Sequence, residues 1–186
     1  MKAQRVDYTI VESPVGDLRL TSDGLGLTSL YMESQKGKLE PEPHWRRDDA
    51  AFERVRRQLR AYFAGDLQDF DLPLSLRGTE FQKRVWEALC AIPFGETISY
   101  AELARRIEAP RAVRAVGAAV GRNRIGIIVP CHRVIGSGGA LTGYAAGLDR
   151  KRWLLSHEQA VRSPLNFTLE SRPSPAKLIP NAVSGA

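Results

Sequence analysis

Apolar and polar residues alternate over the first thirty positions in a pattern typical of short β-strands. Residues 8–11 are rich in β-forming side chains, residues 18–20 alternate, and residues 27–32 form a third apolar stretch. Asp23 and Gly24, between the last two stretches, form a frequent hairpin turn sequence. The pattern therefore predicts a small antiparallel sheet.

After a polar, proline-containing stretch at residues 33–43, which is expected to be a loop, the apolar positions change to a helical period. This period predicts a helix that Asp48 or Asp49 caps and Gly65 ends. The arginines between the apolar positions are expected on its solvated face. The apolar positions of this helix are Phe52, Val55, Leu59 and Phe63.

A second segment starts near residue 74 and contains three predicted helices. The first has apolar residues at helical spacing. Ser99 and Glu102 have the spacing of a capping box and are expected to begin the second. Pro110 suits the first position of the third, which is expected over residues 110–122. Two short helices joined by a tight turn are typical of a helix-turn-helix, although any helical hairpin shares this pattern.

The apolar run at residues 125–129 predicts a buried strand, and Cys131 and His132 follow it. A cysteine attacks as the thiolate, so it needs a neighbouring group that takes its proton. The dipeptide alone is weak evidence, because most cysteines are small buried side chains without a chemical role. A glycine-rich loop and a helix over residues 149–158 are expected next.

Composition adds little to the fold and more to the choice of partner. The 186 residues are 43% hydrophobic and 26% charged, which is ordinary for a globular protein of one or two domains. The net charge of +6 favours a polyanionic partner, although a merely basic surface explains it equally well. Cys90 and Cys131 are the only cysteines, which argues against a disulfide framework and a cysteine-based zinc site.

These patterns together predict an α+β fold with two domains. Residues 1–73 are expected to form a supporting domain, a small antiparallel sheet with one helix. Residues 74–160 are expected to form a mostly helical domain, with a winged-helix-like helix-turn-helix and an active-site loop. Residues 161–186 are expected to be an extended or disordered tail. Because no apolar signal or membrane-length stretch is seen, we expect a cytoplasmic protein with no membrane partner.

Five blocks of sequence carry a resemblance to a known family. In order and spacing, the chain resembles the O6-alkylguanine-DNA alkyltransferases, also called methylated-DNA–protein-cysteine methyltransferases, and their bacterial single-function members in particular. The resemblance is strong over residues 75–160 and loose before them. The blocks are residues 94–100, 111–117, Asn123, residues 130–136 and residues 150–158.

The resemblance implies direct-reversal DNA repair. The expected partner is duplex DNA that carries O6-alkylguanine, with O4-alkylthymine as a further candidate substrate. Since the alkyl group ends as a thioether on Cys131, transfer is expected to be irreversible and limited to one turnover. The family pattern makes His132 the base that acts through a water and Glu158 the carboxylate that orients it. No cofactor and no metal are expected.

Five residues match positions of the family that bind the flipped base. Tyr100 matches a tyrosine that helps to rotate the nucleotide and donates to guanine. Asn123 matches the hinge asparagine, and the backbone of Val134 matches an acceptor for the guanine amino group. Tyr144 and Ala145 fall in the loop that walls the alkyl pocket.

The third helix is expected to lie in the minor groove of DNA. Arg114 matches the arginine that enters the base stack in place of the flipped nucleotide. The small residues Ala112, Ala115 and Gly117 permit close approach of the backbone, and Arg111 is a further DNA-binding residue. Binding is expected to depend on salt and little on sequence.

Three features depart from the family or from some members. Arg124 stands where many members have proline, so the turn after the hinge is expected to be looser or to add a phosphate contact. Ala145 stands where some have serine, and leaves only a backbone N–H there. The N-terminal half also lacks the cysteines that bind structural zinc in some relatives.

Three alternatives remain. A non-catalytic relative would bind lesions without a cysteine, which Cys131 argues against. A helix-turn-helix regulator would read bases in the major groove, but the third helix offers few base-reading side chains. A Cys-His hydrolase would need an oxyanion hole and would turn over. The alkyltransferase itself is expected to be a monomer in the cytoplasm, associated with the nucleoid.

Overall fold

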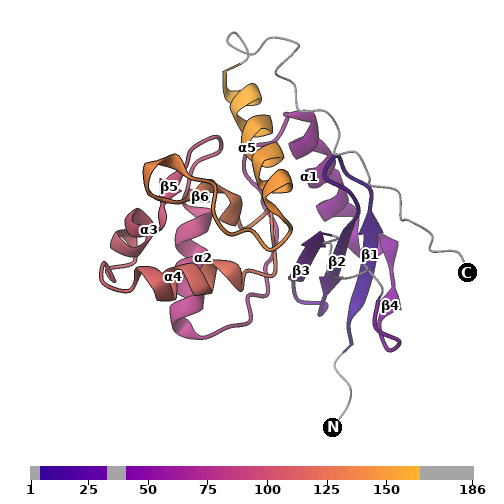
Figure 1. The fold of residues 1–186 in the computed structure, drawn as a ribbon. Helices are drawn as coiled ribbons and strands as arrows, with labels where there is room; N and C mark the ends of the chain where they lie inside the picture. The colour runs from indigo at the N-terminus through magenta and orange to yellow at the C-terminus, as the bar shows by residue number, and fades with distance from the viewer. Residues whose placement is uncertain (1–4, 33–40, 164–186) are drawn as a thin grey trace, which may run out of the picture.

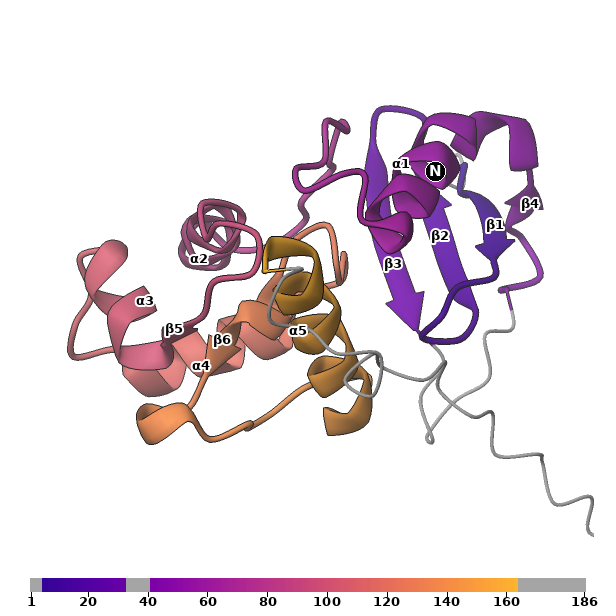
Figure 2. The same cartoon turned by 90° about the horizontal axis from the view of Figure 1, so that it is seen from above.

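A sheet and a group of helices form the two sides of the molecule, and helix α5 (Leu148–Arg162) lies between them (Figures 1 and 2). The computed structural model describes residues 5–32 and 41–163. Most of the predicted loop at residues 33–43 therefore lies outside the described residues, as does nearly all of the predicted tail. The observed α+β architecture agrees with the predicted fold class.

The N-terminal side is a four-stranded sheet in the order β3-β2-β1-β4. Strands β1 (Asp7–Val11), β2 (Leu18–Ser22) and β3 (Leu27–Met32) are antiparallel neighbours, and the short β4 (Arg46–Arg47) runs parallel to β1. The three strands predicted from alternation are thus confirmed.

Helix α1 (Glu53–Ala64) packs against the sheet, after one turn of 3-10 helix at Asp49–Phe52. Asp48 caps this turn through its side chain, as predicted. Gly65 ends α1 with φ +86°, a left-handed conformation that favours glycine. A Cβ atom there would lie 2.9 Å from the Val161 side chain, so the turn also needs glycine for close packing on α5.

The helices α2, α3 and α4 form the other side of the molecule, with a two-stranded parallel sheet beside them (Figure 1). Helices α3 and α4 pack against each other and α2 packs on both, which confirms the predicted helical hairpin. Their bounds are α2 (Glu80–Cys90), α3 (Tyr100–Arg106), α4 (Val113–Gly121), β5 (Ile98–Ser99) and β6 (Val134–Ile135).

One half of the capping box predicted at Ser99 and Glu102 is present at the start of α3. The Ser99 hydroxyl accepts a hydrogen bond from the Glu102 N–H. The Glu102 carboxylate forms ion pairs with Arg105 and Arg106 in the same helix. Glu102 therefore stabilises α3 along its surface, while Ser99 accepts a hydrogen bond from a free N–H group of its first turn.

The predicted strand at residues 125–129 is wrong. The chain there forms successive turns, in which the N–H groups of Ile128 and Val129 donate back to Gly126 and Ile125. Ile127 has φ +69°, which no regular strand allows. The run is apolar because its side chains are buried, and such burial does not require a strand.

Two predicted helix boundaries also need correction. The helix expected over residues 110–122 begins at Val113, because the Ala112 N–H donates to Ala109 and closes a turn around Pro110 first. Helix α5 runs to Arg162, so the predicted tail begins two residues too early.

One hydrophobic core runs through both sides of the molecule. A backbone hydrogen bond also joins the sheet to the helical side: the Leu30 N–H of β3 donates to the Arg124 carbonyl at 2.8 Å. Leu30 also forms an isolated parallel bridge with Ile125. Among residues 5–32 and 41–163, no helix has the length and apolar character to span a membrane.

Candidate active site

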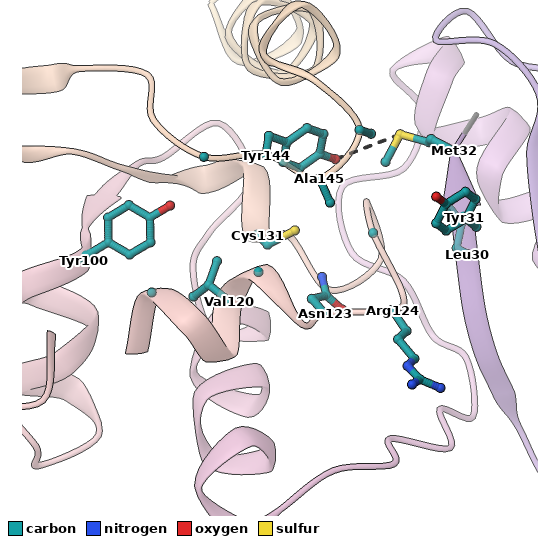
Figure 3. A pocket seen from close by; sticks show the side chains of 15 residues that line it. Leu30, Tyr31, Met32, Tyr100, Val120, Asn123, Arg124, Cys131, Tyr144 and Ala145 are labelled. Atoms are coloured by element: carbon teal, nitrogen blue, oxygen red, sulfur yellow. Dashed lines mark hydrogen bonds between the residues drawn. The ribbon is translucent and has the colours of Figure 1, made fainter. Parts of the chain in front are cut away.

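Cys131 begins a turn of 3-10 helix (Cys131–Arg133) at the end of the buried turns. Its side chain faces a cavity of about 380 Å³ and is only 8% exposed. Figure 3 shows the sulfur between Asn123 and Tyr144, directed toward β3. The cavity walls come from β3, from the end of α4 and the turns after it, from Tyr100, and from residues 143–146.

Burial raises the pKa of the Cys131 thiol, and an Asn123 hydrogen bond and the charge of Lys151 oppose this only in part. The thiol is therefore protonated at neutral pH. Any nucleophilic step at this sulfur needs a base that removes its proton.

His132 and Glu158 form a fully buried pair. The Nε2 atom of His132 lies 2.7 Å from Glu158 Oε1, and neither side chain is exposed to solvent. Burial opposes ionisation of Glu158, but hydrogen bonds from His132 and Arg133 overcome it and hold its pKa well below the usual range. Glu158 is thus ionised, and the structure joins two residues that are 26 positions apart.

The Glu158 carboxylate accepts five hydrogen bonds. Arg133 donates to both oxygens, at 2.9 and 3.0 Å. The Gly95 N–H donates to Oε2, while His132 and the Tyr62 hydroxyl share Oε1. A buried carboxylate needs such partners, because an unpaired charge in the interior is strongly unfavourable.

The charge state of His132 suits a base. Burial lowers its pKa, although the Glu158 carboxylate opposes this, so the imidazole is neutral at neutral pH. Since Nε2 donates to Glu158, Nδ1 carries the free lone pair. Among residues 5–32 and 41–163, the buried Nδ1 has no hydrogen-bond partner, which leaves it able to accept a proton.

Asn123 connects the end of α4 to the turns before Cys131. Its amide donates to the Val129 carbonyl at 2.8 Å and its oxygen accepts from the Ile125 N–H at 2.9 Å. The side chain also lines the cavity. This position fixes the cysteine turn relative to the helix.

The other predicted base-binding residues divide into two groups. Tyr100, Tyr144 and Ala145 line the cavity. The Tyr144 hydroxyl lies 4.0 Å from the sulfur of Met32 on β3. Val134 does not line the cavity, and its carbonyl accepts a hydrogen bond from Lys151 at 2.6 Å.

The residues predicted to bind DNA lie on α4 and the turn before it. Arg111, Arg114 and Ala115 are exposed, and Ala112 is partly buried. Gly117 lines the cavity, where a Cβ atom would lie at an ordinary 3.8 Å from the Tyr100 ring. The exposed Arg124 lines the cavity at the other side of Asn123.

Three residues near the site were missed from the sequence. Tyr62 lies in the apolar stripe of α1 and looks like an ordinary core residue, so no signal distinguished it. Lys151 carried a signal, because it falls on the buried face of α5 at helical spacing from Leu154 and Glu158. Met32 contributes to the cavity from a strand far away in sequence.

Comparisons with known proteins give one consistent result. Sequence models described as the ribonuclease-like domain and the DNA binding domain of 6-O-methylguanine DNA methyltransferase match residues 6–76 and 80–160. A Mycobacterium tuberculosis methylated-DNA--protein-cysteine methyltransferase is 53% identical over 88% of this chain and 98% of its own length. A Methanosarcina barkeri protein of the same name is 52% identical over 82% of this chain and 96% of its own.

A solved structure agrees with these sequences. The crystal structure of Mycobacterium tuberculosis OGT in complex with DNA has a TM-score of 0.77 and 53% identity to this chain. The match covers 83% of this chain and 94% of that one. The similarity therefore extends over both sides of the molecule and includes the whole site.

Proposed function

Since the chain belongs to the 6-O-methylguanine DNA methyltransferase family, we propose that it repairs O6-alkylguanine in duplex DNA by moving the alkyl group to Cys131. One observation carries this proposal. A buried thiol faces an open cavity next to a neutral imidazole that an ionised carboxylate orients. This arrangement can generate a thiolate inside the protein at the moment it is needed.

The proposed transfer uses only side chains of this protein and a water molecule. His132 Nδ1 takes the thiol proton through a water, which leaves an imidazolium that Glu158 stabilises. The thiolate attacks the alkyl carbon, a sulfur–carbon bond forms, and the bond from that carbon to O6 of guanine breaks. Guanine leaves as an anion that the Tyr100 hydroxyl stabilises by donating a hydrogen bond. The anion then takes up one proton from water and the imidazolium releases the thiol proton, so that neutral guanine and neutral His132 result. The thioether on Cys131 has no good leaving group, so each molecule acts once.

The target atom lies inside a duplex, so the nucleotide must first be flipped out. We assign α4 to the minor groove, where Ala112, Ala115 and Gly117 allow the backbone to approach. Arg114 would fill the gap left in the stack, and Arg111 would contact phosphate. The exposure of both arginines and the net charge of +6 support this assignment.

The flipped base would enter the cavity beside Cys131. Tyr144 and Ala145 would wall the alkyl group, and Asn123 would hold the cysteine turn in place. The carbonyl of Val134 already accepts from Lys151, so any contact with the guanine amino group would use its second lone pair.

The thiol, the imidazole and the carboxylate of the proposed step all lie within one chain, where His132 and Glu158 are already in contact. We therefore infer a monomer. A nucleophilic thiol must also stay reduced, which suits the cytoplasm and, there, the DNA of the nucleoid.

A mass measurement tests the proposal. The purified protein is mixed with a short duplex that carries one O6-methylguanine, and intact and peptide masses are recorded. We expect a gain of one methylene group on the Cys131 peptide that stops at one equivalent per chain. Cys131→Ala should gain nothing and still bind the duplex. The matched variant Cys90→Ala should gain the same mass as the wild type.

The remaining outcomes separate the alternatives. Lesion binding without a mass gain in the wild type would contradict transfer and indicate a binding-only relative. If the protein neither bound the duplex nor gained mass, the hydrolase and regulator hypotheses would be favoured instead.

A further inference from the structure

Helix α1 contributes a phenol to the buried carboxylate of the site. The hydroxyl of Tyr62 donates to Glu158 Oε1 at 2.8 Å, and Tyr62 is fully buried. The same oxygen accepts from His132 Nε2 at 2.7 Å. Arg133 also donates to this oxygen, at 3.0 Å. Donors from two distant parts of the chain, Tyr62 on α1 and the residues of the cysteine turn, therefore share one oxygen atom.

The position of this phenol is fixed by a second link between α1 and α5. His157, next to Glu158 in sequence, donates from Nε2 to the Tyr62 carbonyl at 2.9 Å. The two rings meet edge to face with centroids 5.4 Å apart. Phe70 and Phe94 pack against the Tyr62 ring at 5.4 and 6.0 Å. The hydroxyl thus has little freedom to turn away from Glu158.

We propose that Tyr62 is a positioning residue for alkyl transfer, which sets the basicity of His132 through its hydrogen bond to Glu158. This inference rests on the proposed function only for its effect on rate. The hydroxyl stays a donor at every working pH, because burial and the Glu158 charge raise the pKa of Tyr62 well above its usual value.

The expected direction follows from the shared oxygen. Each donor withdraws negative charge from Oε1. Without the phenol, that oxygen would attract the Nε2–H of His132 more strongly, stabilise the imidazolium and raise the pKa of His132. The charged and titratable groups that act on this imidazole are Glu158 and Lys151 from α5, Arg133 from the cysteine turn, and Tyr62 through Glu158.

The test substitutes Tyr62→Phe, which keeps the ring and removes only the hydroxyl. The titration of His132 is followed by NMR, which is practical because the chain has only three histidines. We expect the pKa of His132 to rise by roughly 0.5 to 1 unit, the share of one charge-assisted hydrogen bond. Tyr8→Phe, which removes a phenol from the sheet, should leave this pKa unchanged.

The rate of methyl transfer supplies a second measurement. Since the base must be neutral to accept a proton, the acid limb of the rate profile should move to higher pH by the same amount in Tyr62→Phe. A folded variant with an unchanged or lowered pKa of His132 would overturn the inference. A uniform loss of rate at every pH would also overturn it and indicate only a structural role.

A chemical substitution covers the case in which Tyr62→Phe does not fold. Replacing all tyrosines by 3-fluorotyrosine makes each phenol a stronger donor, so the pKa of His132 should fall. A rise or no change would contradict the inference. Because the NMR titration needs no alkyl transfer, its result stands even if the proposed repair activity fails.

Discussion

Lys151 is a fully buried cation beside the site. Its ammonium group donates to the Val134 carbonyl at 2.6 Å and to the Thr142 carbonyl at 2.8 Å. These two carbonyls belong to β6 and to the loop that walls the cavity. The charge also lowers the pKa of the Cys131 thiol, against the larger effect of burial. One side chain therefore holds the wall and favours the thiolate.

We predict that Lys151→Met lowers both stability and rate. Loss of the two hydrogen bonds leaves the buried Val134 carbonyl without this donor, which should lower the free energy of unfolding by about 1–3 kcal/mol. The single-turnover rate should fall because the thiol pKa rises. Urea unfolding and methyl-transfer kinetics measure the two effects. Lys83→Met, at an exposed pair with Glu80, should change stability by less than about 0.5 kcal/mol.

The hairpin between β2 and β3 connects the sheet to the segment that leads to α2. The Asp23 carboxylate accepts from the N–H groups of Leu25 and Gly26 within the turn. It also accepts from Ser75 and pairs with Arg77 at 2.7 Å. Although burial opposes it, these partners hold the pKa of Asp23 well below its usual 3.8.

We predict a pH-dependent effect of Asp23→Asn. A depressed carboxyl pKa contributes stability above the unfolded value of 3.8, and this contribution is lost as pH falls below it. The variant should therefore be less stable than the wild type by about 1–3 kcal/mol at pH 7. The difference should shrink progressively below pH 3.8. Denaturant unfolding across this range measures it, with Asp17→Asn as the exposed control. A constant difference at every pH would contradict the ionic account.

Elements with a clear period and a cap were predictable from sequence, and elements defined by their surroundings were not. The strands of the sheet and helix α1 follow their periodicity, and Asp48 and Gly65 mark the ends. The strand prediction for residues 125–129 failed because a fully buried run has no hydrophobic period. Turns provide hydrogen bonds for its backbone groups as well as a strand would. The predicted start of α4 at Pro110 was wrong because proline also fits the turn before a helix.

The cavity lies where the two sides of the molecule meet. Met32 of β3 contacts Tyr144 in its wall, with the Tyr144 hydroxyl 4.0 Å from the Met32 sulfur. Gly126 lies beside them, and a Cβ atom there would lie 3.0 Å from the end of the Met32 side chain. The sheet is therefore part of the cavity wall. The division into domains at residue 73 stays a prediction, because one core crosses it.

We predict that Met32→Phe makes the protein selective for small alkyl groups. The larger ring would occupy space that a bulky substituent needs, so transfer from O6-benzylguanine should slow about tenfold more than transfer from O6-methylguanine. Single-turnover rates on both substrates measure this. Leu25→Phe, at an 85% exposed position in the turn between β2 and β3, should leave the ratio unchanged. Equal slowing of both substrates would contradict a role for Met32 in the wall.

The site was predictable to the extent that its residues match the family pattern, which also identified Glu158, 26 positions after His132. Cys131, His132 and Asn123 lie within ten positions of one another, and a local pattern contains them. Tyr62 and Met32 reach the site only through the packing of the sheet and α1 against the helices. No local pattern records that packing, so the fold had to be known before their positions had a meaning.

The backbone bond from Leu30 to Arg124 has a consequence for how motion in the protein can be observed. The Leu30 amide can exchange its hydrogen for deuterium only when the sheet separates from the turn that follows α4. The exchange rate of the Leu30 amide therefore measures how often the turn after α4 separates from the sheet. A natural amide reports on this movement, and the protein needs no added label.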